Sequence, residues 1–225
     1  MIPIPLVVIG AGGNSLSIVD AVIETNRKSN SGPLYDLRGF LDDLPENRGR
    51  SVLGFPVLGP LADATKLDPT WKFINGIASE ASFRSKPETN ARTGIPRARF
   101  ESVVHPAATV SPNAKVGAGT AIMAGSVICA EAQVGDHVVI LQNTVVNHHS
   151  VVGDYATLSS GITVLGFVNI ARNAFIGGGA SLRPRISIGE GALVGMGSVV
   201  VKDVAPGHVV AGNPARQLRV KSADA

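Results

Sequence analysis

Aliphatic residues recur at a fixed six-residue spacing through the second half of the chain. From Val104 to Val200, all seventeen positions at this spacing are Val, Ile or Leu, and no insertion breaks the register. The residue four places after each is mostly Ala, Ser or Thr, as at Thr120 and Ala180. An α-helix needs a period near 3.6 and a hairpin strand needs alternation, so neither explains this spacing.

A coil with three flat faces does explain it. Each hexapeptide supplies one short strand and one corner, three hexapeptides complete an 18-residue turn, and the aliphatic side chain points inward onto its equivalent in the next turn. Such a coil gains stability turn by turn. Four glycines are separated from one another by 18 residues or a multiple of 18, so they are predicted to share one corner. Glycine there permits backbone conformations closed to other residues. The four are Gly117, Gly135, Gly153 and Gly189.

The first half has the pattern of a small α/β domain. Apolar runs predict strands, and a 3.6-residue pattern predicts a helix after the first of them. Strands are expected at 4–9, 38–42 and 71–75, a short element at 54–57, helices at 16–27 and 79–92, and a loop at 26–36. Strands that alternate with helices favour a parallel sheet with ligands at the strand C-termini.

A glycine-rich turn joins the first strand to the first helix. It reads Gly10-Ala-Gly12-Gly13-Asn14-Ser15, so the third glycine of a dinucleotide fingerprint is absent. It is either a turn without a ligand or a phosphate cradle at a helix N-terminus. Asp42 or Asp43, after the second strand, could accept hydrogen bonds from a ribose or a base.

Composition narrows the class of protein. With 44% apolar residues and a net charge of +3 the chain can bury a core, and no apolar run is long enough to span a membrane. The sequence has no run of basic residues that would indicate binding to nucleic acid. The single Cys129 forbids an internal disulfide, and the N-terminus lacks the features of a signal peptide, so we expect a cytoplasmic protein.

The two halves together resemble bacterial nucleotide-sugar acetyltransferases, which include the bacillosamine and perosamine N-acetyltransferases and the sialic-acid O-acetyltransferase-like proteins of the hexapeptide-repeat acyltransferase superfamily. The resemblance covers nearly the whole chain and rests on the segments 10–13, 40–43, 104–106, 146–149 and 212–215. It implies an α/β, Rossmann-like nucleotide-sugar-binding domain at 1–99. It also implies a left-handed parallel β-helix acyltransferase domain with a C-terminal tail at 100–225. Relatives are usually homotrimers with active sites between subunits and acetyl-CoA between neighbouring prisms.

The resemblance also assigns roles to residues. The catalytic base falls on His148 and the oxyanion donor on the Gly166 N–H, while the acidic partner of the base falls on His149, which cannot supply a negative charge. A second family histidine falls on Thr157. The implied acetyl-CoA contacts are Gly166, Gly178, Met196, Gly197 and Pro214. The implied nucleotide-sugar contacts are Gly10, Gly12, Gly13, Asn14, Asp42 and Asp43.

The function implied is acetyl-CoA-dependent N-acetylation of a UDP-, GDP- or dTDP-linked amino sugar for bacterial surface glycans, without a metal. O-acetylation of a sugar is the alternative, although a hydroxyl is a weaker nucleophile and needs more help from the base. A carbonic-anhydrase-like zinc site would need His137, His148 and His149 to converge across a trimer interface, which is difficult for two adjacent residues. Two further alternatives are that His148 is a solvated corner residue and that the prism is purely structural, which would leave the first domain unexplained.

Overall fold

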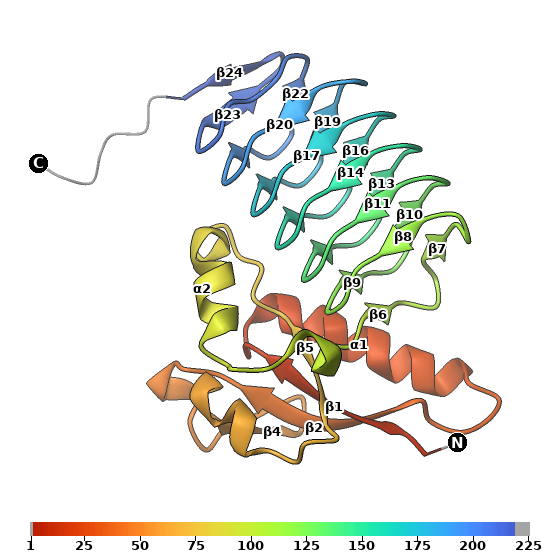
Figure 1. Ribbon diagram of the computed structural model, residues 1–225, viewed down its shortest axis with the longest axis vertical. Helices are drawn as coiled ribbons and strands as arrows, with labels where there is room; N and C mark the ends of the chain where they lie inside the picture. Colours follow the sequence, from red (N-terminus) through yellow and green to blue (C-terminus); the bar gives the residue numbers. More distant parts are fainter. Residues whose placement is uncertain (1, 219–225) are drawn as a thin grey trace, which may run out of the picture.

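The computed structural model describes residues 2–218, so the last residues of the predicted second domain, 219–225, lie outside the described part. A small sheet with its helices carries a tall prism of stacked coils (Figure 1). No helix among the described residues has both the length and the apolar character that crossing a bilayer requires.

The first sheet has five strands, and all its pairings are parallel except the β3–β4 pairing. The strand order across it is β3 (Ser51–Val52), β4 (Phe55–Gly59), β2 (Tyr35–Leu41), β1 (Ile4–Ile9) and β5 (Lys72–Asn75). The chain runs outward from β1 to β2 and β4 and then returns to the other side of β1 at β5. The crevice beside such a reversal is where open parallel sheets bind ligands.

Helices lie on both sides of this sheet. They are α1 (Gly13–Lys28), η1 (Pro45–Asn47), η2 (Leu61–Lys66), η3 (Phe83–Ser85), α2 (Lys86–Ala91) and η4 (Arg97–Arg99). Leu6 and Val8 face α1 and the prism, whereas Val7 and Ile9 face η2. The helix expected over 79–92 is shorter than predicted, because 79–82 form a serine-bonded turn and Pro87, which lacks an N–H, lies at the start of α2.

The six-residue register builds three sheets of two-residue strands. One holds β7 (Thr109–Val110), β10 (Val127–Ile128), β13 (Val145–Val146), β16 (Thr163–Val164), β19 (Ser181–Leu182) and β22 (Val199–Val200). The second holds β8 (Lys115–Val116), β11 (Gln133–Val134), β14 (Val151–Val152), β17 (Asn169–Ile170) and β20 (Ser187–Ile188). The third holds β6 (Val103–Val104), β9 (Ala121–Ile122), β12 (Val139–Ile140), β15 (Thr157–Leu158), β18 (Phe175–Ile176), β21 (Leu193–Val194), β23 (Val209–Gly212) and the antiparallel β24 (Ala215–Gln217).

The inward stacking of the aliphatic residues is confirmed. From Ile122 to Val200 every residue of the register is buried, and Val104, at the open lower end, is the most exposed member. Each strand pairs with the strand 18 residues later, for example Ile128 with Val146. This prism buries a continuous aliphatic column.

The reason predicted for the shared glycine column is wrong. None of Gly117, Gly135, Gly153 and Gly189 has φ in the left-handed region. Instead, the next coil passes too close for a side chain: a Cβ on Gly153 would lie 2.6 Å from the backbone N of Arg172. The left-handed residues stand two places later in each hexapeptide, from Gly119 to Gly197, and many of them are not glycine.

The N-terminal part covers one face of the prism, the outer face of the sheet β6–β9–β12–β15–β18–β21. Val103, Ala121 and Val139 join the core around α1, and Phe175 and Leu193 pack against Phe83. Figure 1 shows α1 between the first sheet and the lowest coils, and α2 beside the prism. Residues 2–218 leave the other two prism faces uncovered.

Lys86 anchors α2 to the covered face. Its side chain is fully buried, and its Nζ donates to the carbonyl oxygen of Tyr155 at 3.1 Å and to Thr157 Oγ1 at 3.2 Å. Thr157, on which the resemblance places a second family histidine, therefore serves the junction between the two parts. Burial lowers the pKa of Lys86 to about 7.

Lys86 is expected to make the stability of the protein pH-dependent. Its pKa rises from about 7 in the folded protein to 10.5 in the unfolded chain. Between these values the unfolded chain binds the extra proton, so stability rises with pH across this window, and below pH 7 the full burial penalty remains. The Tm of the wild type should therefore rise from pH 7 to about 9.5 relative to that of Lys86→Met. Exposed Lys115→Met is the control, and parallel curves for wild type and Lys86→Met would contradict the assignment.

Candidate active site

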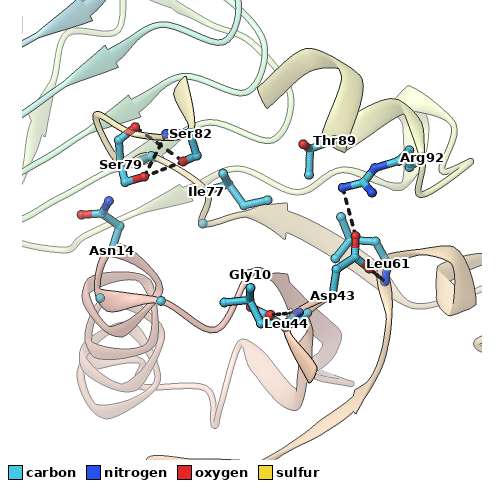
Figure 2. Close-up of a pocket in the computed structure, with 15 residues that line it drawn as sticks. Gly10, Asn14, Asp43, Leu44, Leu61, Ile77, Ser79, Ser82, Thr89 and Arg92 are labelled. Carbon is cyan, nitrogen blue, oxygen red and sulfur yellow. Dashed lines mark hydrogen bonds and ion pairs between the residues drawn. The ribbon is translucent and has the colours of Figure 1, made fainter. Parts of the chain in front are cut away.

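A cavity of ≈ 330 Å³ opens at the C-terminal ends of β1, β2 and β5, beside the reversal in strand order. Figure 2 shows Asp43 and Arg92 on one side of it and Asn14, Ser79 and Ser82 on the other. All six predicted nucleotide-sugar residues line it: Gly10, Gly12, Gly13, Asn14, Asp42 and Asp43. The structure thus brings them together in one cavity.

The glycine-rich turn presents backbone to this cavity. Gly10 has φ +89, and a Cβ there would lie 2.9 Å from Ile77 Cγ1, so the turn requires glycine at that position. A Cβ on Gly12 or Gly13 would meet nothing within 4 Å. No side chain caps the N-terminus of α1. Its first N–H groups and the positive end of the helix dipole can therefore receive an anion such as a phosphate.

Asp42 and Asp43 shape the cavity through backbone hydrogen bonds. The two carboxylate oxygens of Asp42 accept the N–H of Ala11 at 2.7 Å and of Leu44 at 2.8 Å. Asp43 accepts the N–H of Leu61 at 2.9 Å and forms an ion pair with Arg92 at 3.0 Å. Each carboxylate retains lone pairs that could accept a further hydrogen bond. A contact from either aspartate to a ribose or a base stays a prediction.

Several lining residues had no individual signal in the sequence. Thr89 and Arg92 come from α2 and the residue just after it, and Ser79 and Ser82, whose Oγ atoms are 2.6 Å apart, come from the turn before η3. They add hydroxyl groups and a cation opposite the glycine-rich turn. Only the return of the chain over the sheet places them there, and no local pattern predicts that return.

His148 lies on the corner between β13 and β14 and is exposed. Its ring lies against Gly166, which occupies the same position one coil later: a Cβ on Gly166 would lie 2.7 Å from His148 Cε1 and 3.0 Å from Nε2. The Gly166 N–H donates to no acceptor within residues 2–218. An imidazole and an N–H group without an acceptor therefore lie side by side, and acyl transfer uses groups of these two kinds.

His149 contacts His148 directly. Its Nδ1 lies 3.2 Å from the Nδ1 of His148, and the two rings meet edge to face. His149 is itself in the left-handed region, with φ +58, and this turns its side chain toward His148 instead of to the opposite side as in an extended strand. This hydrogen bond can form only if one of the two Nδ1 atoms carries a proton and the other does not.

The predicted acetyl-CoA residues do not all share the corner of His148 and Gly166. Gly178 and Met196 lie one coil apart on the corner that joins the third sheet to the first, next to Gly197, and Met196 is 80% exposed. Pro214 lies in the turn between β23 and β24. The two corners are the two borders of the uncovered sheet β7–β10–β13–β16–β19–β22.

The cavity and His148 of one chain face away from each other. The N-terminal part covers one of the three prism faces, and the corner between β13 and β14 is the corner opposite that face. Gln142, on a corner that borders the covered face, contacts Ser17 of α1 at 3.0 Å, whereas His148 lies on the far corner. One chain therefore holds the parts of a reaction site without assembling them.

His137 does not join His148 and His149. It lies on a third corner, between the rings of Phe100 and Tyr155, and burial lowers its pKa to about 4. Within the described residues no three potential ligands gather to hold a metal ion. One chain thus does not assemble the three-histidine site of the carbonic-anhydrase alternative.

The coil of hexapeptides defines a hexapeptide-repeat protein, and solved structures narrow the class. No family model and no curated protein matches the chain. The acetyltransferase domain of PglB from Neisseria gonorrhoeae is 31% identical, with a TM-score of 0.81 over 95% of this chain and 99% of that domain. PerB from Caulobacter crescentus is 26% identical, with a TM-score of 0.81 over 95% and 97%. WeeI from Acinetobacter baumannii is 26% identical, with a TM-score of 0.80 over 96% and 100%.

Both parts of the chain are covered by these matches. The chain belongs to the nucleotide-sugar acetyltransferases of the hexapeptide-repeat family. It is accordingly an acyltransferase. The PglB domain has been solved with acetyl coenzyme A, and PerB with CoA and GDP-perosamine.

Proposed function

We propose that the protein transfers the acetyl group of acetyl-CoA to the amino group of a nucleotide-linked amino sugar in bacterial surface glycan biosynthesis. The observation that carries this proposal is the match over both parts of the chain to PerB, whose structure contains CoA and GDP-perosamine. The cavity beside α1 would hold the nucleotide sugar, with a phosphate at the helix N-terminus formed by Gly12 and Gly13. This cradle is compatible with UDP, GDP or dTDP.

The corner at His148 supplies the groups that the reaction needs. The sugar amine attacks the thioester carbonyl, and His148 Nε2 takes the proton that the nitrogen loses as the new N–C bond forms. The Gly166 N–H donates to the oxygen on which negative charge develops. The C–S bond then breaks, and His148 returns the proton to the departing CoA sulfur.

A homotrimer completes the site in this proposal: since the cavity and His148 of one chain face away from each other, the nucleotide cavity of one copy works with His148 of another. Half-buried Val127, Val145 and Val199, with Thr163 and Ser181, form the outer face of the uncovered sheet, which is less polar than the exposed outer face of the β8–β20 sheet. His148 and Gly166 border it on one side, Gly178 and Met196 on the other. Packing this face around a threefold axis would set the His148 corner of one copy against the Gly178 corner of its neighbour, with CoA between them.

Further features of the proposal follow from the family. The first sheet is Rossmann-like, which its strand order around β1 supports, and the prism coil is left-handed. A division between residues 1–99 and 100–225 is supported by β6, which begins at Val103. The enzyme works in the cytoplasm, where acetyl-CoA and nucleotide sugars are made.

A ligand panel tests the function. UDP-, GDP- and dTDP-linked 4-amino sugars are added with CoA in a thermal-shift experiment, and CoA release from acetyl-CoA is then measured. One nucleotide class should raise the Tm, because a ligand that binds only the folded state stabilises it, and its amino sugar should release CoA. Release with the hydroxyl analogue instead would favour O-acetylation. No shift and no release across the panel would refute the proposal.

A further inference from the structure

Three side chains from successive coils stack beside the catalytic corner. His149, Phe167 and Arg185 follow one another at 18-residue spacing. The rings of His149 and Phe167 are stacked, with centroids 4.7 Å apart and planes 19° apart. The guanidinium carbon of Arg185 lies 4.4 Å from the centre of the Phe167 ring, so Phe167 lies between the imidazole and the cation. We call these three residues the corner stack.

The backbone keeps the corner stack in line although its conformation is unfavourable. All three residues are left-handed, with φ of +58, +61 and +63, a region that bulky residues seldom adopt. Most other corners place glycine or asparagine in this conformation, as at Asn143 and Asn173, although Glu131, His137 and Tyr155 adopt it as well. Large side chains at these three positions are therefore not what the coil itself requires, and a strained position calls for a function.

The corner stack includes the hydrogen-bond partner of His148. His148 Nδ1 and His149 Nδ1 share one hydrogen bond at 3.2 Å, so one of them carries the proton and the other accepts it. Only if His148 donates is its Nε2, beside Gly166, left with the lone pair that a base requires. Glu131, one coil on the other side, forms no ion pair with His149 within the described chain.

We propose that Phe167 and Arg185 are positioning residues that hold the plane of the His149 ring, so that its Nδ1 accepts the hydrogen bond from His148 Nδ1–H. The Nε2 of His148 is thereby kept free to take the proton. This inference rests on the proposed role of His148. His149 thus takes the place of the acidic residue of relatives as the partner that orients the base. The acidic residue does this by its charge, whereas His149 does it as a stacked ring with a fixed plane.

The chain offers a matched control for the test. A second stack of His137, Tyr155 and Arg172 lies on another corner, with ring centroids 4.8 Å apart and the guanidinium 5.1 Å from the tyrosine ring. Phe167→Asn and Tyr155→Asn each remove the middle ring and insert a residue that the coil already tolerates in this conformation. Phe167→Tyr keeps the stack and serves as the conservative variant.

Nitrogen NMR of ¹⁵N-histidine-labelled protein without substrate is the decisive measurement, with His148 assigned by its loss in His148→Gln. We expect His148 to carry its proton on Nδ1 in the wild type, Tyr155→Asn and Phe167→Tyr. In Phe167→Asn the proton should move to Nε2. The kcat should then fall about 10-fold with both KM values unchanged, because a loss of this size is part of what a general base contributes. A proton on Nε2 in the wild type, or an unchanged tautomer in Phe167→Asn, would overturn the inference. Because this readout needs no turnover, it decides the inference even if the ligand panel fails.

Discussion

Replacing His148 by alanine is expected to lower kcat by about 10³-fold, within the range that a positioned general base contributes. The exposed imidazole lies on a corner, so its removal leaves no cavity in the aliphatic column of the prism. The nucleotide cavity is built by the first sheet and is untouched. Steady-state turnover of acetyl-CoA with the amino sugar, together with the thermal shift given by that sugar, measures both quantities.

A second histidine serves as the control for this variant. His208, near the upper end of the prism, lies outside the proposed site, and His208→Ala should keep the wild-type kcat. Two results would count against His148 as the base: a His148→Ala enzyme with more than a tenth of the wild-type kcat, or a loss of the nucleotide-sugar thermal shift as large as the loss of turnover.

Gly166→Ala should reduce kcat by about 10²-fold, because small displacements of a catalytic group have effects of that size. The new Cβ would stand 2.7 Å from His148 Cε1, so the imidazole must move. The N–H of residue 166 is retained, and φ there is not left-handed, so alanine does not strain the backbone. The Tm should therefore change little while turnover falls.

A double-mutant cycle shows whether Gly166 acts through the imidazole. If the alanine methyl group only displaces His148, the His148→Ala/Gly166→Ala enzyme should be no slower than His148→Ala alone. Losses that multiply in the double variant would mean that Gly166 serves catalysis independently of the His148 ring.

The prism was predictable because one short pattern fixes every coil. The aliphatic register from Val104 to Val200 sets the strands, the inward face and the 18-residue stacking, and β1 coincides with the predicted strand. The reason for the glycine column was not predictable, since close approach of the next coil and a left-handed φ both favour glycine. Only coordinates show that the column from Gly117 is of the first kind.

The site was predictable only where it is local in sequence. The glycine-rich turn and Asp43 could be found from their places after strands, and His148 from the resemblance. Arg92, the ion-pair partner of Asp43, could not, because the pair joins residues from separate elements across the cavity. Lys86 is buried although lysine is usually exposed, so its burial could not be predicted. The corner stack depends on left-handed backbone conformations that His, Phe and Arg do not predict.

The central claim is that the nucleotide cavity of one copy works with His148 of another. Mixed assemblies test it most directly. One chain carries His148→Ala, and the other carries Gly12→Asp, which caps α1 favourably but places a carboxylate where a phosphate should bind. Each variant alone should be inactive.

The two chains are co-expressed in equal amounts, and the mixed assemblies are verified. They should recover about a quarter of the wild-type activity per site. In a symmetric assembly, about one neighbour pair in four joins an intact nucleotide cavity to an intact His148. Mixed assemblies that remain as inactive as the separate variants would contradict a site shared between copies.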